Sequence, residues 1–201
     1  MKDIFTIGYT AFEINKFVDI MKQYGISCVI DVRSAPFSKF YTNYNIENIK
    51  KTLNGNNIYY RNYKDEFGAR QTDTRYFSNN GCLDFELFTK SDSFISGYNK
   101  LIDGMKQGYT FALMCAEKDP LNCHRTIMVS REFHKFGYAI KHILENCIYQ
   151  TQNDIENRML NIYFPDRNQR SLFNDELSED ELINQCYKKK NIEIGYREDE
   201  D

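Results

Sequence analysis

The sequence predicts an α/β fold, a three-layer sandwich around a mostly parallel sheet of about five strands. Short apolar runs alternate with stretches whose apolar residues recur at helical spacing, the pattern of strand–helix–strand units. The best-defined strands are apolar throughout, as strands buried on both faces are. A chain of 201 residues can bury such a core without staples. We expect one α/β domain over residues 1–165 with an irregular insertion, and an acidic, partly helical or flexible extension over 166–201.

The first strand–helix–strand unit occupies the first 32 residues. A strand over 4–7 ends at Gly8, and the capping-box pattern Thr10-Ala-Phe-Glu13 predicts that a helix starts there. Apolar residues at i, i+3, i+4 and i+7 form one face of that helix, which Gly25 ends. An apolar run over 28–32 then predicts a buried strand.

The later elements follow from the same periodicities. We expect helices over 45–55, from Ser91 or Ser93 to 108, and from 120 or 122 to 137, with strands over 58–60, 109–115 and 138–144. Residues 61–90 read as irregular. Ile155, Met159 and Ile162 fit one face of a further helix, and 178–190 fits another with acids in its first turn.

Charge is divided unevenly along the chain. The net charge is −3, but residues 171–201 hold ten acids and four bases, so residues 1–170 carry +3. The 41% hydrophobic content excludes a disordered chain, and no apolar run approaches the roughly 20 residues of a membrane span. Without a signal-peptide pattern at the N-terminus, we expect a cytoplasmic protein, no membrane contact and six reduced cysteines.

The densest group of reactive side chains lies between a predicted buried strand and the next helix. It reads Cys115-Ala-Glu117-Lys-Asp-Pro-Leu-Asn-Cys123-His124-Arg125. Asp119 and Pro120 suit an N-cap and the first helical position. Backbone N–H groups at such a helix start bind anions and lower the pKa of a nearby thiol.

Three interpretations of this group compete. The first is nucleophilic or redox chemistry at Cys115 or Cys123, with His124 as acid or base and Arg125 holding an anion. The second is a metal site, which we do not favour because adjacent Cys123 and His124 would point different ways on a helix. The third is a buried Cys115 beside a structural Glu117–Arg125 ion pair. The position of the whole group at a strand end favours a function over the third interpretation.

A second candidate segment, Asp31-Val-Arg33-Ser34-Ala-Pro36, follows the second strand. Asp31 could orient His124 or Arg125 or act as a base, and Arg33 could hold a carboxylate or phosphate. The alternative is an Asp–Arg pair that stabilises the turn. The expected substrate-binding set is Gly8, Tyr9, Arg33, Ser34, Pro36, Arg70 and Arg125.

Residues 33–76 interleave eight bases and four acids with nine aromatic residues. Basic and aromatic residues together suit stacked bases and bound phosphates. We modestly favour the other interpretation, that these rings pack a loop against the sheet, because a net charge of +3 is small for a nucleic-acid-binding domain. His142, near the end of the last strand, is expected to be a structural histidine.

Four motifs together resemble one family: Thr6-Ile-Gly-Tyr9, Asp31-Val-Arg-Ser-Ala-Pro36, Cys115-Ala-Glu-Lys-Asp-Pro120 with Cys123-His-Arg125, and His142-Ile-Leu144. They resemble the domain-of-unknown-function family 488 over roughly residues 3–165. The family's Leu-Gly-Gly-Arg loop reads Phe67-Gly-Ala-Arg70 here. The resemblance implies an α/β sandwich with a pocket lined by these motifs, and no particular reaction.

Together these observations predict a small cytosolic enzyme acting on an anionic small molecule or nucleotide-like substrate. Cys115 or Cys123 would supply a thiolate or shape the pocket, and Glu117, Asp31 and His124 are the acid–base candidates. We expect no cofactor and no metal, and leave the oligomeric state open. One alternative is a non-catalytic module that binds nucleotide or nucleic acid. Another is an interaction protein recruited through its acidic tail.

Overall fold

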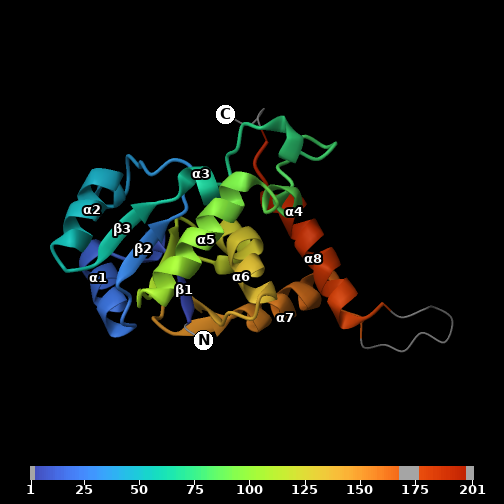
Figure 1. The fold of residues 1–201 in the computed structure, drawn as a ribbon. Coiled ribbons are helices and arrows are strands. Elements are labelled where there is room, and N and C mark those ends of the chain that lie inside the picture. The colour runs from blue at the N-terminus through green and yellow to red at the C-terminus, as the bar shows by residue number, and fades with distance from the viewer. Residues whose placement is uncertain (1–2, 168–176, 198–201) are drawn as a thin grey trace.

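A computed structural model describes residues 3–167 and 177–197 of the chain (Figure 1). A six-stranded sheet in the order β3-β2-β4-β1-β5-β6 crosses the centre. All neighbouring strands are parallel except β5 and β6, which are antiparallel. The strands are β1 (Ile4–Gly8), β2 (Cys28–Asp31), β3 (Tyr59–Asn62), β4 (Phe111–Cys115), β5 (Ile140–Ile143) and β6 (Tyr149–Thr151). The predicted α/β class is confirmed; β6, with three half-exposed residues, is too short to leave a pattern in the sequence.

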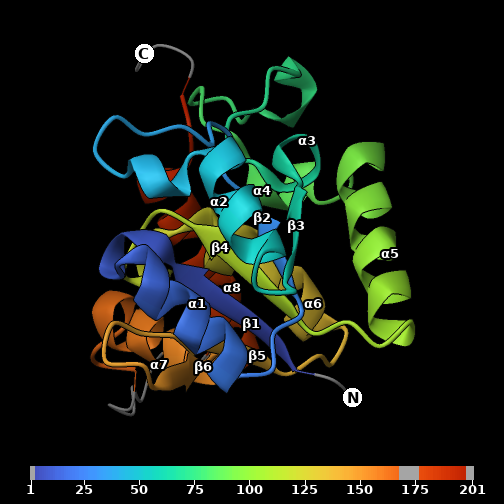
Figure 2. The ribbon, with the colours of Figure 1, turned by 90° about the vertical axis from the view of Figure 1, so that its left-hand side faces the viewer.

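Helices cover both faces of this sheet, as the two views show (Figures 1 and 2). α1 (Ile14–Gln23) and α2 (Ile46–Asn54) lie on one face, and α5 (Asp92–Lys106) and α6 (Arg131–Lys135) on the other. Alternate residues of β4 serve the two cores: Leu113 and Cys115 pack toward α5 and α6, whereas Ala112 and Met114 pack toward α1 and α2. The Cys115 side chain therefore belongs to the α5–α6 face.

The segment expected to be irregular contains single turns of helix. These are α3 (Lys64–Phe67), the 3₁₀ turn Thr74–Tyr76 and α4 (Phe85–Phe88). Asp84 caps α4 by accepting hydrogen bonds from two backbone N–H groups, and Ser91 caps α5 by accepting one from the Phe94 N–H group. The insertion therefore packs as an ordered part of the α5–α6 core through Phe67, Phe85 and Phe88.

Two predicted helix starts are wrong. Thr10 does not cap α1; it lies in the 3₁₀ turn Tyr9–Ala11, and its hydroxyl donates to the carbonyl oxygen of Ala116 at 2.6 Å. The helix expected from 120 or 122 is interrupted instead. A 3₁₀ turn (Pro120–Asn122) is followed by extended backbone at Cys123, then by the π-helix Arg125–Ser130 and α6.

The C-terminal part of the chain packs on the body of the fold. α7 (Gln152–Tyr163) contacts α8 (Glu179–Ile194), which begins at Ser178 with a capping box and buries Cys186 and Tyr187. Beyond α8, the carbonyl of Tyr196 accepts a hydrogen bond from the Leu83 N–H group at 2.9 Å. The helix predicted from Ile155, Met159 and Ile162 is confirmed as α7, in which Ile155 and Met159 are buried and Ile162 is 58% exposed.

The division into a domain over 1–165 and an extension over 166–201 stays a prediction, and residues 168–176 and 198–201 of that extension lie outside the described residues. Among the helices that the structure describes, none has the length and apolar character needed to cross a membrane.

Candidate active site

The carboxyl ends of three neighbouring strands meet at one edge of the sheet. Gly8 of β1 lies opposite Cys115 of β4, and Asp31 of β2 lies opposite Met114 of β4. Ligands of such sheets bind beyond these strand ends. A cleft of about 560 Å³ opens there. The segments after β2 and β4 therefore both contribute to this cleft.

Seven residues of the predicted site line this cleft: Tyr9, Arg33, Ser34, Arg70, Cys115, Glu117 and His124. Asp31, Cys123 and Arg125 are buried beneath it. Pro36 does not line it; its carbonyl accepts a hydrogen bond from the N–H group of Ile46 at the start of α2. Sequence reasoning missed a further part of the wall, residues 193–197 after and at the end of α8, because nothing in their pattern links them to the strand ends.

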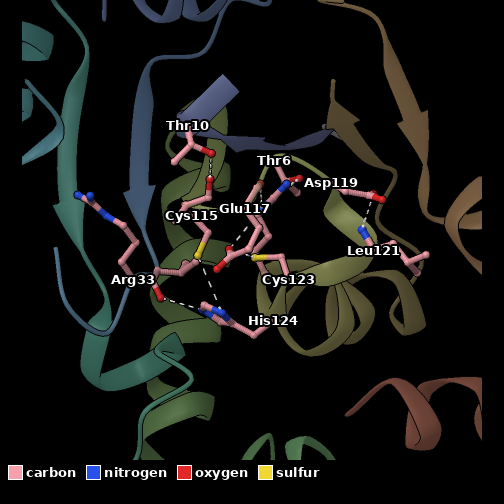
Figure 3. A network of polar contacts seen from close by, with 12 residues as sticks. Thr6, Thr10, Arg33, Cys115, Glu117, Asp119, Leu121, Cys123 and His124 are labelled. Carbon is pink, nitrogen blue, oxygen red and sulfur yellow. Dashed lines mark hydrogen bonds and ion pairs between the residues drawn. The ribbon is translucent and has the colours of Figure 1, made fainter. Parts of the chain in front are cut away.

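His124 is held so that one ring nitrogen faces a thiol. Its Nε2 lies 2.9 Å from the carbonyl oxygen of Val32, and its Nδ1 lies 3.9 Å from Cys115 Sγ (Figure 3). A carbonyl can only accept, so Nε2 carries a hydrogen. In the neutral imidazole, Nδ1 then presents its lone pair to the Cys115 sulfur. A nucleophile beside an oriented base is the arrangement that activates cysteine in enzymes.

Cys123 and His124 point to the same place because the backbone changes conformation between them. Cys123 is extended (φ −138°, ψ 136°), whereas His124 is helical (φ −59°, ψ −26°). Cys115 Sγ, Cys123 Sγ and a ring nitrogen of His124 consequently lie within 4.8 Å of one another. The sequence argument that the two adjacent side chains diverge assumed a continuous helix, and that assumption is wrong.

Glu117 reaches the cluster from the cleft side. A carboxylate oxygen of Glu117 lies 2.8 Å from Cys123 Sγ, close enough to share the thiol proton (Figure 3). Partial desolvation, together with the charge on Cys123, raises the pKa of Glu117. The side chain still remains 43% exposed, so this carboxyl joins the buried thiol to the cleft.

The Cys115 and Cys123 thiols contact each other, so the protonation of one affects the pKa of the other. The pKa of Cys115 is raised because its S–H is held by Cys123 and because it is buried. Burial opposes ionisation of Cys123, but the contact with Cys115 and the nearby Arg125 and His124 lower the pKa of Cys123. For His124, burial disfavours the charged ring, but its contacts with Cys123 and Glu117 raise its pKa. The pair thus loses its first proton readily and its second with difficulty.

Arg125 supports the loop that carries Glu117. Its side chain is fully buried, and its Nη1 donates to the Glu117 carbonyl oxygen at 2.8 Å, whereas the Glu117 carboxylate is 3.9 Å away. Its Nε donates to Thr6 Oγ1 at 3.4 Å. The expected Glu117–Arg125 ion pair is therefore secondary to a hydrogen bond with the backbone.

A buried hydrogen-bonded chain continues from Arg125 across the sheet. Thr6 Oγ1 lies 2.9 Å from His142 Nδ1, and His142 Nε2 lies 2.8 Å from Gln152 Oε1. Burial and the charge of Arg125 lower the pKa of His142 to about 3, so the ring is neutral. His142 is a structural histidine, as the sequence suggested.

Asp31 and Arg33 pair with each other. Arg33 Nε and Nη2 donate to the two carboxylate oxygens of Asp31 at 2.8 and 2.6 Å, and Tyr60 donates to the same carboxylate at 2.6 Å. His124 is oriented by Val32 instead, so the proposal that Asp31 orients His124 or Arg125 is wrong. Figure 3 shows the Arg33 guanidinium pointing away from the thiols. Its Nη1 nonetheless has no hydrogen-bond partner among the described residues.

Arg70 lines the cleft from the loop after α3. Its backbone N–H donates to Ser34 Oγ at 2.9 Å, which joins the loop after β2 to the loop after α3. The Arg70 guanidinium lies over the ring of Tyr196, 5.3 Å from its centroid. Ser34 and Arg70 are thus brought together as expected, and the C-terminal segment packs against them.

Fold and site together define an α/β protein with a Cys–Cys–His–Glu cluster beyond the strand ends. The family described as "Domain of unknown function DUF488" matches residues 13–131, more than half of the chain. The chain belongs to this family, and the resemblance drawn from its motifs is confirmed. Comparison with curated proteins gave no match, and comparison with solved structures gave none either.

Proposed function

We propose that this protein is an enzyme that uses a cysteine nucleophile on an anionic small molecule or nucleotide-like substrate. The observation that carries the proposal is the contact between Cys115 and His124 at the wall of the cleft. Cys115 is among the residues that line the cleft, whereas Cys123 is buried and is not among them. We place its action in the cytosol, where both thiols stay reduced.

The nucleophile forms by a proton shift within the cluster. The thiol pair loses one proton first, from Cys123, so Cys115 attacks as its own proton moves to the Cys123 thiolate. Alternatively, His124 Nδ1 takes the Cys115 proton as the sulfur attacks. In either route the Cys115 sulfur forms the new bond and the substrate's leaving group departs. Glu117, at the edge of the cleft, is placed to protonate that group.

The charges of the cleft favour an anion. Arg70 and Arg197 line it. Of the two glutamates in its wall, Glu193 is paired with Lys190 at 2.8 Å, and Glu117 has a raised pKa. Arg33 also lines the cleft, but its charge is balanced by Asp31.

Thiol alkylation tests the nucleophile. In protein kept metal-free with a chelator, iodoacetamide at pH ~7 should modify Cys115 faster than Cys147, although Cys147 is the more exposed thiol, because Cys115 can pass its proton to Cys123 or His124 as it reacts. His124→Gln should slow modification of Cys115, and Cys147→Ser should leave its rate unchanged. The sites and rates are read by peptide mass spectrometry. Modification of Cys147 first, with Cys115 and Cys123 slow and unaffected by His124→Gln, would refute a nucleophilic Cys115.

Anion binding has a separate test. Inorganic phosphate should slow alkylation of Cys115 in a saturable way, and Arg70→Gln should weaken this protection. The matched control is Arg75→Gln, because Arg75 is exposed and paired with Asp73 away from the cleft. Equal protection in both variants would exclude Arg70 from the anion site.

A second candidate is nucleic-acid binding by the loop after β2. Phe37 and Phe40 are 69% and 91% exposed and flank Lys39, and Phe37 lines the cleft. Exposed rings beside cations suit stacked bases. Three other rings of residues 33–76, Tyr44, Tyr60 and Phe67, are buried in the cores, as the packing interpretation expects, whereas Tyr41 and Tyr59 are 40% and 48% exposed. Oligonucleotide binding that weakens steeply with salt, and that Phe40→Ala reduces, would support this function.

A further inference from the structure

We propose that Cys115, Cys123 and His124 bind a soft divalent metal ion, Zn²⁺. The inference goes beyond the proposed function and does not depend on it. The three ligand atoms lie within 4.8 Å of one another, and the Cys115 Sγ to His124 Nδ1 distance is 3.9 Å. Typical Zn–S and Zn–N bonds of about 2.3 and 2.0 Å place tetrahedral ligands roughly 3.5–4 Å apart. Small side-chain movements therefore complete three bonds to one ion.

The hydrogen bond of His124 prepares the ring for a metal. Histidines that bind metals commonly donate their second ring N–H to a carbonyl or carboxylate, which holds the other nitrogen toward the ion. His124 Nε2 makes such a contact with the Val32 carbonyl at 2.9 Å. Its Nδ1 therefore faces the two sulfurs with a lone pair available for coordination.

Charge and burial also fit zinc. All three ligands are buried, with exposures of 2%, 1% and 8% for Cys115, Cys123 and His124. An isolated divalent ion would be very costly at such a place, but two thiolates neutralise it. Binding releases the thiol protons, so the metal itself supplies the driving force for ionising the pair. Thiolate and imidazole ligands select zinc over magnesium or calcium.

The fourth coordination position opens toward the cleft. Cys115 and His124 line the cleft wall, and the Glu117 carboxylate reaches within 2.8 Å of Cys123 Sγ from the same side. Three protein ligands with one open position are typical of catalytic rather than structural zinc sites. A bound ion holds both sulfurs, so the metal-bound form and the form with a reactive Cys115 are two alternative states of one site.

Cobalt substitution tests the site directly. Reduced, chelator-treated protein should bind one Co²⁺ per chain with a thiolate-to-cobalt charge-transfer band and the intense visible bands of tetrahedral cobalt. Added Zn²⁺ should abolish both. Competition with a chromophoric chelator should then show that Cys115→Ser, Cys123→Ser and His124→Asn each weaken zinc binding by more than about 100-fold. Matched controls are Cys147→Ser and His134→Asn, which change a thiol and an imidazole outside the cluster and should bind as the wild type does.

The wild-type spectrum alone can overturn the proposal. Absence of a charge-transfer band, or a band that Cys115→Ser leaves intact, would refute the site whether or not the variants fold. Unchanged zinc affinity in His124→Asn, with circular dichroism showing a folded protein, would refute the three-ligand assignment. Alkylation of the chelator-treated, metal-free protein gives a result that is independent of these metal-binding measurements. Slow alkylation of Cys115 together with a normal cobalt spectrum would remove the proposed nucleophile and leave the metal site standing.

Discussion

Gly8 determines how closely the Glu117 loop approaches the end of β1. A Cβ atom at this position would overlap the backbone carbonyl of Glu117, which cannot move aside as a side-chain tip can. That same carbonyl accepts the hydrogen bond from buried Arg125. The absence of a side chain at Gly8 therefore allows the acid, the thiols and the arginine to occupy one small volume.

We predict that Gly8→Ala lowers the free energy of unfolding by about 3 kcal/mol, because the added methyl group forces the loop away from the strand. Urea denaturation measures this change. Gly55→Ala is the control, since a Cβ atom there has its nearest neighbour at 3.4 Å; its effect should stay below about 1 kcal/mol. Similar losses in the two variants would contradict the overlap.

His142 should make stability depend on pH. Its folded-state pKa of about 3 lies below the ordinary value of 6.5, so the unfolded chain binds a proton that the folded chain does not. Stability should therefore fall as pH decreases, by about 1.4 kcal/mol per pH unit from this group between roughly pH 6 and pH 5. Urea denaturation over that range checks it. His142→Gln should be less stable throughout but have a shallower slope, and an equal slope would show that His142 does not cause it.

Single residues of the site could be predicted where they lie at the end of a strand or just after it. Cys115, Glu117 and His124 follow an apolar strand, and the parallel sheet brings them to the cleft. The partner of Asp31 was not predictable, because Arg33, two residues away, competes for the carboxylate with His124 and Arg125 from a distant segment. Nothing in the sequence decides between partners that are equally suitable in charge.

Among the elements, the short turn before the π-helix directs Cys123. Asp119 caps this turn by accepting from the Leu121 N–H at 3.0 Å, and its carboxylate also binds Arg158 of α7 at 2.7 and 3.0 Å. Asp119 thus fixes the start of the turn, after which the chain extends at Cys123. One aspartate couples the cap, α7 and the geometry of the cluster.

We predict that Asp119→Ala lowers the free energy of unfolding by about 1–2 kcal/mol, because it removes both the cap and the ion pair. Asp119→Asn keeps a capping oxygen and loses only a half-exposed ion pair, so its effect should be about 0.5 kcal/mol. Thermal and urea denaturation of both variants measure the difference. Equal effects would mean that the cap contributes nothing.

Most helices and strands could be predicted from the sequence, but the irregular backbone that connects them could not. Buried Val129 and Phe133 keep a helical spacing through the π-helix and α6, so the pattern predicts one continuous helix. The break at Cys123 depends on the Asp119 contacts and on a hydrogen bond from the Cys123 N–H to the Pro120 carbonyl, neither of which changes the hydrophobic period. Hydrophobic periodicity predicts a helix, but it does not reveal a single extended residue that precedes the helix.

For the whole molecule, the packing of α8 shows most directly how the C-terminal extension relates to the rest of the fold. Tyr187 is buried beneath it, its hydroxyl lies 2.7 Å from both Gln152 and Glu156, and Arg131 lies over its ring. Gln152 also bonds His142, so α8 extends the buried polar network of the sheet. The acidic extension therefore contributes a packed helix besides its negative charge.

We predict that ending the chain after residue 176 lowers the free energy of unfolding by more than about 3 kcal/mol, since it exposes the surface that Cys186 and Tyr187 cover. Ending it after residue 197 should change nothing measurable. Melting temperature and urea denaturation report the effect. Unchanged stability of the shorter chain would show that the extension is an appendage, as the sequence division at residue 165 suggested.

The cleft is built from two parts of the chain that lie far apart in the sequence, the segment with the cluster and the C-terminal segment after α8. The family match spans residues 13–131 and includes the whole Cys–Cys–His–Glu cluster, whereas residues 193–197 lie outside it. The cluster is therefore encoded in one stretch of sequence and part of the cleft's shape and charge in another. Divergence after α8 can reshape the mouth of the cleft while the four side chains of the cluster stay as they are.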